Sequence, residues 1–361
     1  MSKKIFLAGA VICAALLLNI SCNKSTDESK KDSKTTELTI VSTIFPEYDW
    51  MVNLTAGAPV KNELLISNGV DLHSYQASVQ DIIKIAESDM FIYVGGESDF
   101  WVDDVLENHK NVKGVKLLEL IKDDVKEEEV VEGMQAEEEE DEDSEEHHHE
   151  DEEDEDGEEH HHHEDEESEE GHHHHHHHDE DEVEYDEHVW LSVRLANKLC
   201  AALTEKLVEL DPANESIYRA NYAKYSAELT SLDKEYESVI NEGNRKTVLF
   251  ADRFPFRYMT DDYGLNYYAA FVGCSAETAA SFETMAFLTQ KVDELKLPVI
   301  LVLEKSDCKI ADTVIENTNA KDQKVMEMDS IQSVTVADMS AGKTYLSSMK
   351  KNLETLKEAL K

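Results

Sequence analysis

Histidine is the residue type whose placement in this sequence most clearly indicates chemistry, because neutral imidazole is the commonest protein ligand for metals. The chain has 17 histidines, and 14 of them lie between Glu137 and Glu187, together with 31 acidic residues and no lysine or arginine. The other three are His73, His109 and His188. His109 lies in a polar connection, where we expect it to face water. His73 and His188 remain as candidate ligands, although a lone histidine is more often a surface hydrogen-bonding residue.

The His- and acid-rich stretch is a second candidate for metal chemistry. Its imidazole runs, at His147–His149, His160–His163 and His172–His178, lie among carboxylates. Such runs bind zinc weakly, and binding should decrease as the pH falls through about 6.5, the ordinary pKa of imidazole. Its charges repel one another and it cannot form a core, so we expect residues 124–186 to form a disordered loop. The alternative is an acidic spacer with no metal role.

Alternating strand and helix patterns flank this loop and must position the two histidines. Buried-strand patterns, among them 115–118, 298–303 and 324–328, alternate with helical stretches such as 101–108. This alternation predicts parallel sheets covered by helices. A helical pattern of nearly 30 residues, Ala213–Asn241, follows Asp211-Pro212. The predicted fold class is α/β, with two lobes of mainly parallel sheets covered by helices, joined by one long rigid linker helix. The predicted ranges are 38–211 for the N-terminal lobe, 212–243 for the linker and 244–361 for the C-terminal lobe, with the ligand in the cleft between the lobes.

The N-terminus has the pattern of a processing signal. Two lysines precede the apolar run Ile5–Leu18, which is short for a membrane span. A small residue then precedes Cys22, as in a lipobox, although Asn19 stands where leucine is preferred. We expect residues 1–22 to be a lipoprotein signal peptide, with lipidation at Cys22, and residues 23–37 to be a flexible tether. A plain secretory signal or an anchor is the alternative.

Three cysteines lie beyond the predicted signal: Cys200, Cys274 and Cys308. An odd number in an exported protein predicts one disulfide and one free thiol, or no disulfide. Cys274 and Cys308 are the favoured pair because both lie in the C-terminal half, whereas Cys200 lies in a helical apolar pattern. The formal net charge of −46 argues against a nucleic-acid partner.

Three stretches place His73 and His188 in a wider context. They resemble segments of the metal-specific solute-binding proteins of ATP-driven importers, above all the zinc-uptake branch, and the resemblance extends from Thr39 to the C-terminus. It implies that His73 and His188 are metal ligands, and a His- and acid-rich loop between them is typical of this branch. The stretches are TIFPEYDWMVNLTAGAPVKNELLISNGVDLHSYQAS, DMFIYVGGESDFWVDDVL and DEHVWLSV.

The same resemblance implies a third histidine after the long helix, and this sequence lacks it. Arg253 in LFADRFPFRYMTDDYGL stands at that position, and a guanidinium has no lone pair to offer a metal. We expect Arg253 to pair with a nearby carboxylate and hold the cleft, because an unpaired positive charge facing a cation would be strongly unfavourable. The family's last ligand is implied at Asp329 in MEMDSIQS, where the alternative is a helix N-cap before Ser330.

The remaining ligand position is open. Cys274 is one option because thiolate binds zinc. Glu304, at a predicted strand end, and Asp252, next to Arg253, are two others. A site with three protein ligands and one water is the fourth.

Taken together, these features predict a binding protein for zinc and no enzyme activity. Two imidazoles and a carboxylate suit tetrahedral Zn²⁺, whereas Mn²⁺ prefers more oxygen ligands. The resemblance implies a monomer outside the cytoplasm, at a bacterial cell surface or in a periplasm, anchored to the membrane by lipid. It would deliver Zn²⁺ to an ABC permease and its ATPase. The alternatives are a manganese- or other metal-specific binding protein, a surface storage or adhesion lipoprotein acting through its loop, and a zinc hydrolase. His-Glu-x-x-His and Gly-x-Ser-x-Gly motifs are absent from the sequence.

Overall fold

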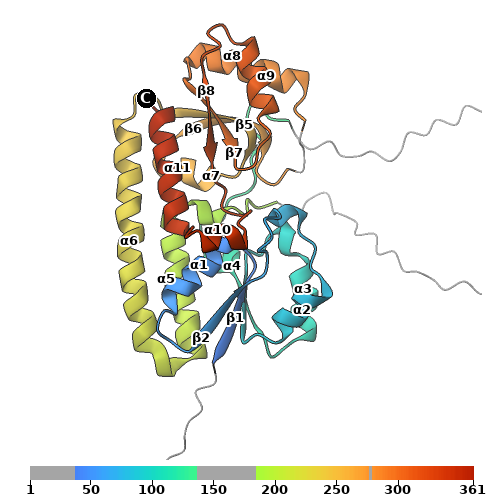
Figure 1. Ribbon diagram of the computed structural model, residues 1–361, viewed down its shortest axis with the longest axis vertical. Coiled ribbons are helices and arrows are strands. Elements are labelled where there is room, and N and C mark those ends of the chain that lie inside the picture. Colours follow the sequence, from blue (N-terminus) through green and yellow to red (C-terminus); the bar gives the residue numbers. More distant parts are fainter. Residues whose placement is uncertain (1–36, 136–183, 276–278) are drawn as a thin grey trace, which may run out of the picture. The chain divides into compact units, whose positions relative to one another are not determined.

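The computed structural model describes residues 37–135, 184–275 and 279–361 (Figure 1). The predicted signal peptide, Cys22, nearly all of the predicted tether and most of the predicted loop lie outside the described residues. Both ends of the predicted loop are described, and they form isolated β-bridges between Glu127 and Tyr185 and between Gln135 and Phe271. No helix in the described ranges is long and apolar enough to cross a membrane.

The first sheet has four parallel strands in the order β2-β1-β3-β4. Alternate residues of its strands face two separate apolar clusters. Ile40 and Ile92 pack with Trp50 of α1 and Leu199 of α5, whereas Phe91 packs with helices α2 and α3 on the other face. The elements of this half are β1 Leu38–Ser42, α1 Phe45–Leu54, β2 Val60–Leu64, α2 Val79–Ala86, β3 Met90–Tyr93, α3 Trp101–Asn108, β4 Lys113–Lys116, α4 Leu117–Leu120 and α5 Val193–Leu210.

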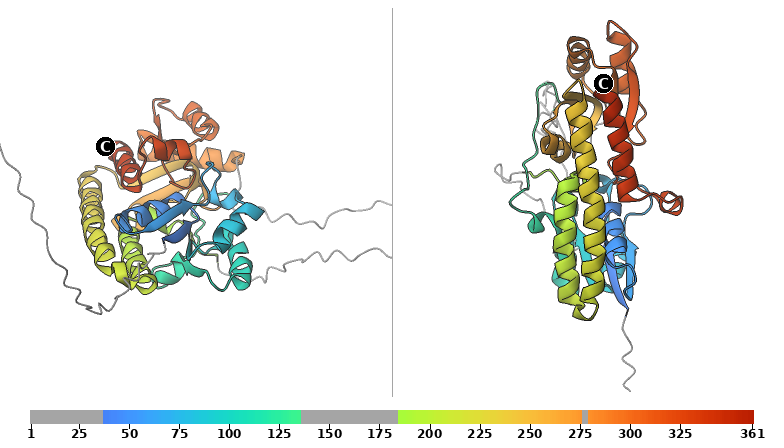
Figure 2. Two further views of the ribbon diagram at one scale, coloured as in Figure 1. Left: turned by 60° about the horizontal axis from the view of Figure 1, so that its bottom comes forward. Right: turned by 90° about the vertical axis from the view of Figure 1, so that its left-hand side faces the viewer.

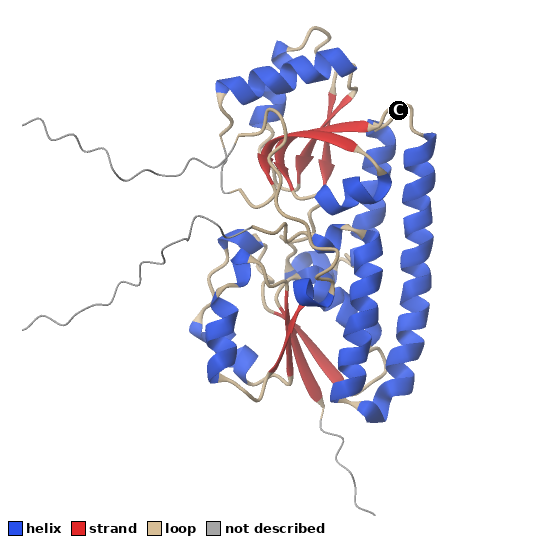
Figure 3. Ribbon diagram, turned by 180° about the vertical axis from the view of Figure 1, so that it is seen from behind, coloured by secondary structure: helices blue, strands red, loops and turns tan. Residues whose placement is uncertain are grey.

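The second sheet repeats this arrangement with four parallel strands in the order β6-β5-β7-β8 (Figure 3). Leu249 and Ile300 face Leu288 and Val314 of helices α8 and α9, whereas Phe250 faces the main core. The elements are β5 Thr247–Phe254, α7 Arg257–Tyr263, β6 Asn266–Val272, α8 Phe282–Leu295, β7 Val299–Leu303, α9 Lys309–Asn317, β8 Lys324–Met328, α10 Val336–Ser340 and α11 Tyr345–Ala359.

The long helix α6, Glu215–Glu242, has 28 residues and connects the two halves. It packs against α5 and α1 of the first half and against α11 of the second, side by side with α5 and α11 in Figure 2. Tyr236 of α6 is fully buried and donates a hydrogen bond to the Met349 carbonyl of α11 at 2.6 Å. Glu37–Lys361 form one compact unit that contains both sheets. The predicted fold class, two parallel-sheet α/β lobes with one long helix, is confirmed.

Three local predictions need correction. Cys274 and Cys308 do not form the favoured disulfide, and both are free thiols, as is Cys200. The fourth strand lies at Lys113–Lys116 rather than at Val115–Leu118, because Leu117 and Leu118 already belong to helix α4. The short helix α10 was not predicted.

Candidate metal centre

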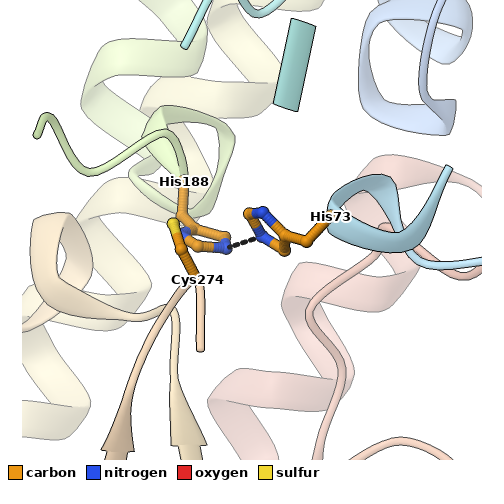
Figure 4. Close-up of side chains that lie close together, drawn as sticks. All are labelled: His73, His188 and Cys274. Atoms are coloured by element: carbon orange, nitrogen blue, oxygen red, sulfur yellow. Dashed lines mark hydrogen bonds between the residues drawn. The ribbon is translucent and has the colours of Figure 1, made fainter. Parts of the chain in front are cut away.

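The structure brings together His73, His188 and Cys274, three residues from distant parts of the chain (Figure 4). One ligand atom from each lies within 4.8 Å of the other two. His73 lies in the 3-10 turn Leu72–Ser74, and His188 directly precedes the 3-10 turn that leads into α5. Cys274 follows the end of β6. The first sheet's half therefore supplies two imidazoles and the second sheet's half supplies a thiol.

The spacing of the two imidazoles is close to what a tetrahedral metal requires. Their Nε2 atoms are 3.1 Å apart, whereas two nitrogens at Zn–N distances of about 2.05 Å and a tetrahedral angle lie about 3.3 Å apart. Burial, together with the nearby His188, lowers the pKa of His73 to about 3. The His73 imidazole is therefore neutral near pH 7, which is the form that can bind a metal.

Asp186 fixes the orientation of His188. Its Oδ1 accepts hydrogen bonds from His188 Nδ1 at 2.9 Å and from the His188 backbone N–H at 2.8 Å. Burial alone would lower the pKa of His188, but the hydrogen bond and charge of Asp186 outweigh burial and raise it. Because Nδ1 donates to the carboxylate, the neutral ring carries its lone pair on Nε2. This carboxylate–histidine arrangement is the usual outer support of metal-binding histidines.

His73 is oriented by different partners. Its backbone N–H donates to Asp71 Oδ1 at 3.1 Å, and its Nδ1 lies 2.7 Å from Ser98 Oγ. Glu187 Oε2 lies 3.8 Å from the same Nδ1 and has no hydrogen-bond partner, whereas Oε1 accepts from the Ser98 backbone N–H at 2.8 Å. Nδ1 is therefore occupied by polar neighbours, and Nε2 is left to face His188.

Cys274 approaches the imidazoles because the residue before it is glycine. A Cβ on Gly273 would lie 2.9 Å from His188 Cε1 and 3.0 Å from the Phe254 carbonyl oxygen, so a larger residue would push the two loops apart. The Cys274 N–H donates to Glu128 Oε1 at 3.2 Å. Burial, reinforced by the Glu128 charge, raises the pKa of the thiol well above its usual value. The thiol is therefore protonated without a metal, and a metal would have to displace its proton.

The three carboxylates considered as ligands are not in this group, and each has other contacts. Asp329 forms an ion pair with Lys343 at 2.6 Å and accepts from the Ile331 N–H at 2.9 Å. Glu304 accepts from the Ser330 N–H and hydroxyl at 2.7 and 2.6 Å. Asp252 accepts from the N–H groups of the following arginine and of Leu303. Among the alternatives for the open position, the structure places only Cys274 beside the histidines.

Arg253 pairs with a carboxylate, as predicted. Its Nη2 lies 2.8 Å from Asp71 Oδ2, which also accepts a hydrogen bond from Gln332 Nε2 at 3.1 Å. The charge at the position where the family has a histidine is thereby neutralised by the segment that carries His73.

Sequence reasoning missed the groups that support the ligands: Asp186, Glu187, Ser98 and Glu128. One signal could have identified the first of them. The pattern Asp-x-His occurs at both predicted ligands, and in both copies the aspartate accepts a hydrogen bond from the backbone N–H of its own histidine. The other three come from segments that are distant in sequence from the residues they contact, and no local pattern marks them.

Comparisons with known proteins identify the family of this chain. The model of the family described as zinc-uptake complex component A, periplasmic (ZnuA), matches residues 40–359. The zinc-binding lipoprotein AdcA of Streptococcus pneumoniae is 29% identical over 362 residues, which cover 99% of this chain and 61% of AdcA. The high-affinity zinc uptake system protein ZnuA of Bacillus subtilis is 27% identical over 359 residues, which cover 97% of this chain and 96% of that protein.

A solved structure gives the same result for the fold. The Zn(II)-bound ZnuA-like domain of S. pneumoniae AdcA superposes with a TM-score of 0.64 at 26% identity, covering 90% of this chain and 99% of that domain. This chain spans 61% of the length of the AdcA proteins that it matches. The family match covers most of the chain, and the chain belongs to the zinc-uptake component A family of solute-binding proteins.

Proposed function

We propose that this chain is the solute-binding component of an ABC-type zinc importer, and that it binds one Zn²⁺ through His73, His188 and Cys274. The observation that carries the proposal is the pair of imidazole Nε2 atoms 3.1 Å apart, with a thiol beside them. Two nitrogens and one sulfur are donors that suit Zn²⁺ and give Mn²⁺ no oxygen ligands. The zinc-binding relatives support the same choice of metal.

A site with three protein donors leaves the fourth tetrahedral position to water or another small ligand. Closed sites with four protein ligands are typical of structural zinc, so an open position fits a zinc ion that has to be released. Zinc is the cargo here, and its release to a membrane permease and the associated ATPase completes the proposed role. Lipidation at Cys22 would hold the protein at the outer surface of the membrane, next to that permease. No catalytic step forms part of the proposal.

The test is a zinc titration of the full chain against a chelator with nanomolar affinity, which outcompetes the weak sites of the His-rich stretch. We expect the parent chain to retain one tightly bound zinc and the His73→Ala/His188→Ala variant to lose it. His109→Ala is the matched control, because it removes a histidine outside the group, and it should bind zinc like the parent. Tight binding that survives in the double variant would refute the proposed site and favour a storage role for the His-rich stretch.

A further inference from the structure

Arg253 contacts the segments on both sides of the metal site. Its Nη2 binds Asp71, two residues before His73, and its Nη1 donates to the Ser275 carbonyl oxygen at 3.4 Å, one residue after Cys274. Asp71 belongs to the first half of the molecule, whereas Arg253 is the penultimate residue of β5 in the second half. One guanidinium thus joins the loop of a nitrogen ligand to the loop of the sulfur ligand.

Asp71 transmits this contact to the ligand itself. Its Oδ2 is held by Arg253 and Gln332, and its Oδ1 caps the turn that carries His73. The Arg253 and Asp71 side chains are 22% and 17% exposed, and Gln332 is 1% exposed, so water competes little for these hydrogen bonds. A charged pair with two further contacts in a shielded place holds its geometry better than an exposed pair does.

We propose that Arg253 is a positioning residue that sets the affinity and the coordination number of the site, by holding the His73 and Cys274 loops at tetrahedral spacing. The inference rests on the proposed function, because it takes these residues as the ligands. Arg253 supplies no lone pair, so this position adds no fourth donor to His73, His188 and Cys274. The fixed spacing favours Zn²⁺ and Co²⁺, which accept four ligands, over ions that need six oxygens.

A purely structural role for the same ion pair would have a different consequence. If Arg253 only held the two halves together, its loss would lower thermal stability and leave the environment of a bound metal unchanged. If it positions the ligands, its loss changes the coordination geometry of the metal. Co²⁺ reports this directly, because tetrahedral Co²⁺ absorbs visible light more strongly than Co²⁺ with five or six ligands.

The experiment compares Arg253→Met and Arg253→Lys with Arg257→Met in the full chain. Arg257 is a matched control, because its side chain is 17% exposed and pairs with Glu129 at 3.1 Å rather than with a residue of the His73 or Cys274 loops. Zn²⁺ affinity is measured by chelator competition, and the visible spectrum is recorded with Co²⁺.

Arg253→Met should weaken zinc binding by about 10- to 100-fold, the usual effect of losing an outer support of a metal ligand, and should reduce the cobalt absorption. Arg253→Lys should fall between Arg253→Met and the parent, because one ammonium cannot reach both loops as the guanidinium fork does. Arg257→Met should match the parent.

Parental affinity and an unchanged cobalt spectrum in Arg253→Met would overturn the inference. If Arg253→Met does not fold, Arg253→Lys provides the test. Parental zinc affinity and an unchanged cobalt spectrum in Arg253→Lys would also overturn the inference. Asp71→Asn adds a double-mutant cycle, in which the combined variant should be about as weak as Arg253→Met alone; additive losses would also count against the inference. His188→Ala separates the two levels of the proposal. Tight zinc binding that survives in His188→Ala refutes the metal site itself. If His188→Ala loses tight zinc binding while Arg253→Met binds zinc like the parent, only the positioning role is refuted.

Discussion

Asp99 offers a test of how burial of charge beside the metal site affects stability. It is 3% exposed and lies in the 3-10 turn next to Ser98, the partner of His73. Its Oδ2 accepts a hydrogen bond from the Gly95 N–H at 2.9 Å, and its Oδ1 has no partner. Burial, reinforced by the charge of Glu187, raises the pKa of Asp99 from 3.8 to about 7. The folded protein therefore holds this proton more tightly than the unfolded chain does.

The sign of the pH effect follows from that difference. Well below pH 3.8 the carboxyl is protonated in both states, and its ionisation has no effect on stability. As the pH rises towards 7 the unfolded chain releases the proton first, so the free energy of unfolding falls. The raised pKa of Asp99 lowers the free energy of unfolding by about 1.5 kcal/mol at pH 5 and by about 4 kcal/mol above pH 7, since each pKa unit corresponds to about 1.36 kcal/mol. Asp99→Asn is neutral at every pH and keeps an acceptor for Gly95, so it removes this cost.

The expected result is that Asp99→Asn gains about 2.5 kcal/mol in unfolding free energy relative to the parent between pH 5 and pH 8. Urea unfolding at the two pH values measures it, with a chelator present to exclude metal. Asp104→Asn is the matched control, because Asp104 is exposed on α3, and it should show no such change. If the difference between Asp99→Asn and the parent is the same at both pH values, the carboxyl is not held protonated by burial, and the reasoning fails.

Three further predictions concern the metal site and its surroundings. Asp186→Asn should weaken zinc binding by about 10- to 100-fold, because it removes the charge that orients His188; chelator competition measures this, and parental affinity would contradict it. Cys274→Ser should weaken zinc binding and abolish the near-ultraviolet sulfur-to-cobalt absorption of the Co²⁺ form, whereas absorption that survives would exclude the thiolate as a ligand. Asp329→Asn should lower the free energy of unfolding by about 1–3 kcal/mol, because Lys343 loses its charged partner. The Asp329→Asn variant should bind zinc with an affinity near that of the parent. A decrease in zinc affinity as large as that in His188→Ala would show that Asp329 is a ligand.

The fold could be predicted because its elements are regular and long enough to show their period. Strands β7 and β8 and helices α3 and α6 were predicted within two residues of their bounds, from apolar runs or helical spacing. The errors lie where one pattern runs into another. The apolar run that forms β4 continues into α4, so the strand was placed two residues late. The short helix α10 has five residues and a capping box, which is too little sequence for a period to appear.

The site was less predictable because its donors come from separate segments. His73 and His188 followed from the resemblance, but the choice between Cys274 and the carboxylates depends on which backbone groups already bind those carboxylates. Asp252 and Glu304 accept backbone N–H groups of neighbouring strands and loops. No local sequence pattern reveals such contacts. The favoured disulfide between Cys274 and Cys308 was also wrong. Both residues lie in the same half of the chain, but that does not make the two thiols partners.

The two Asp-x-His segments show how one local motif serves two purposes in the same site. In each, the aspartate accepts from the backbone of its own histidine and so fixes the turn. Asp186 then turns its oxygen to the imidazole and selects Nε2 as the metal donor. Asp71 turns its second oxygen to Arg253 instead, which leaves the imidazole of His73 to Ser98. The arginine that stands where the resemblance implies a ligand is therefore held by a carboxylate of another loop. On this argument, replacing Arg253 by histidine alone would leave Asp71 without its positively charged partner, held only by Gln332 and the His73 N–H, and an added donor would not by itself improve the site.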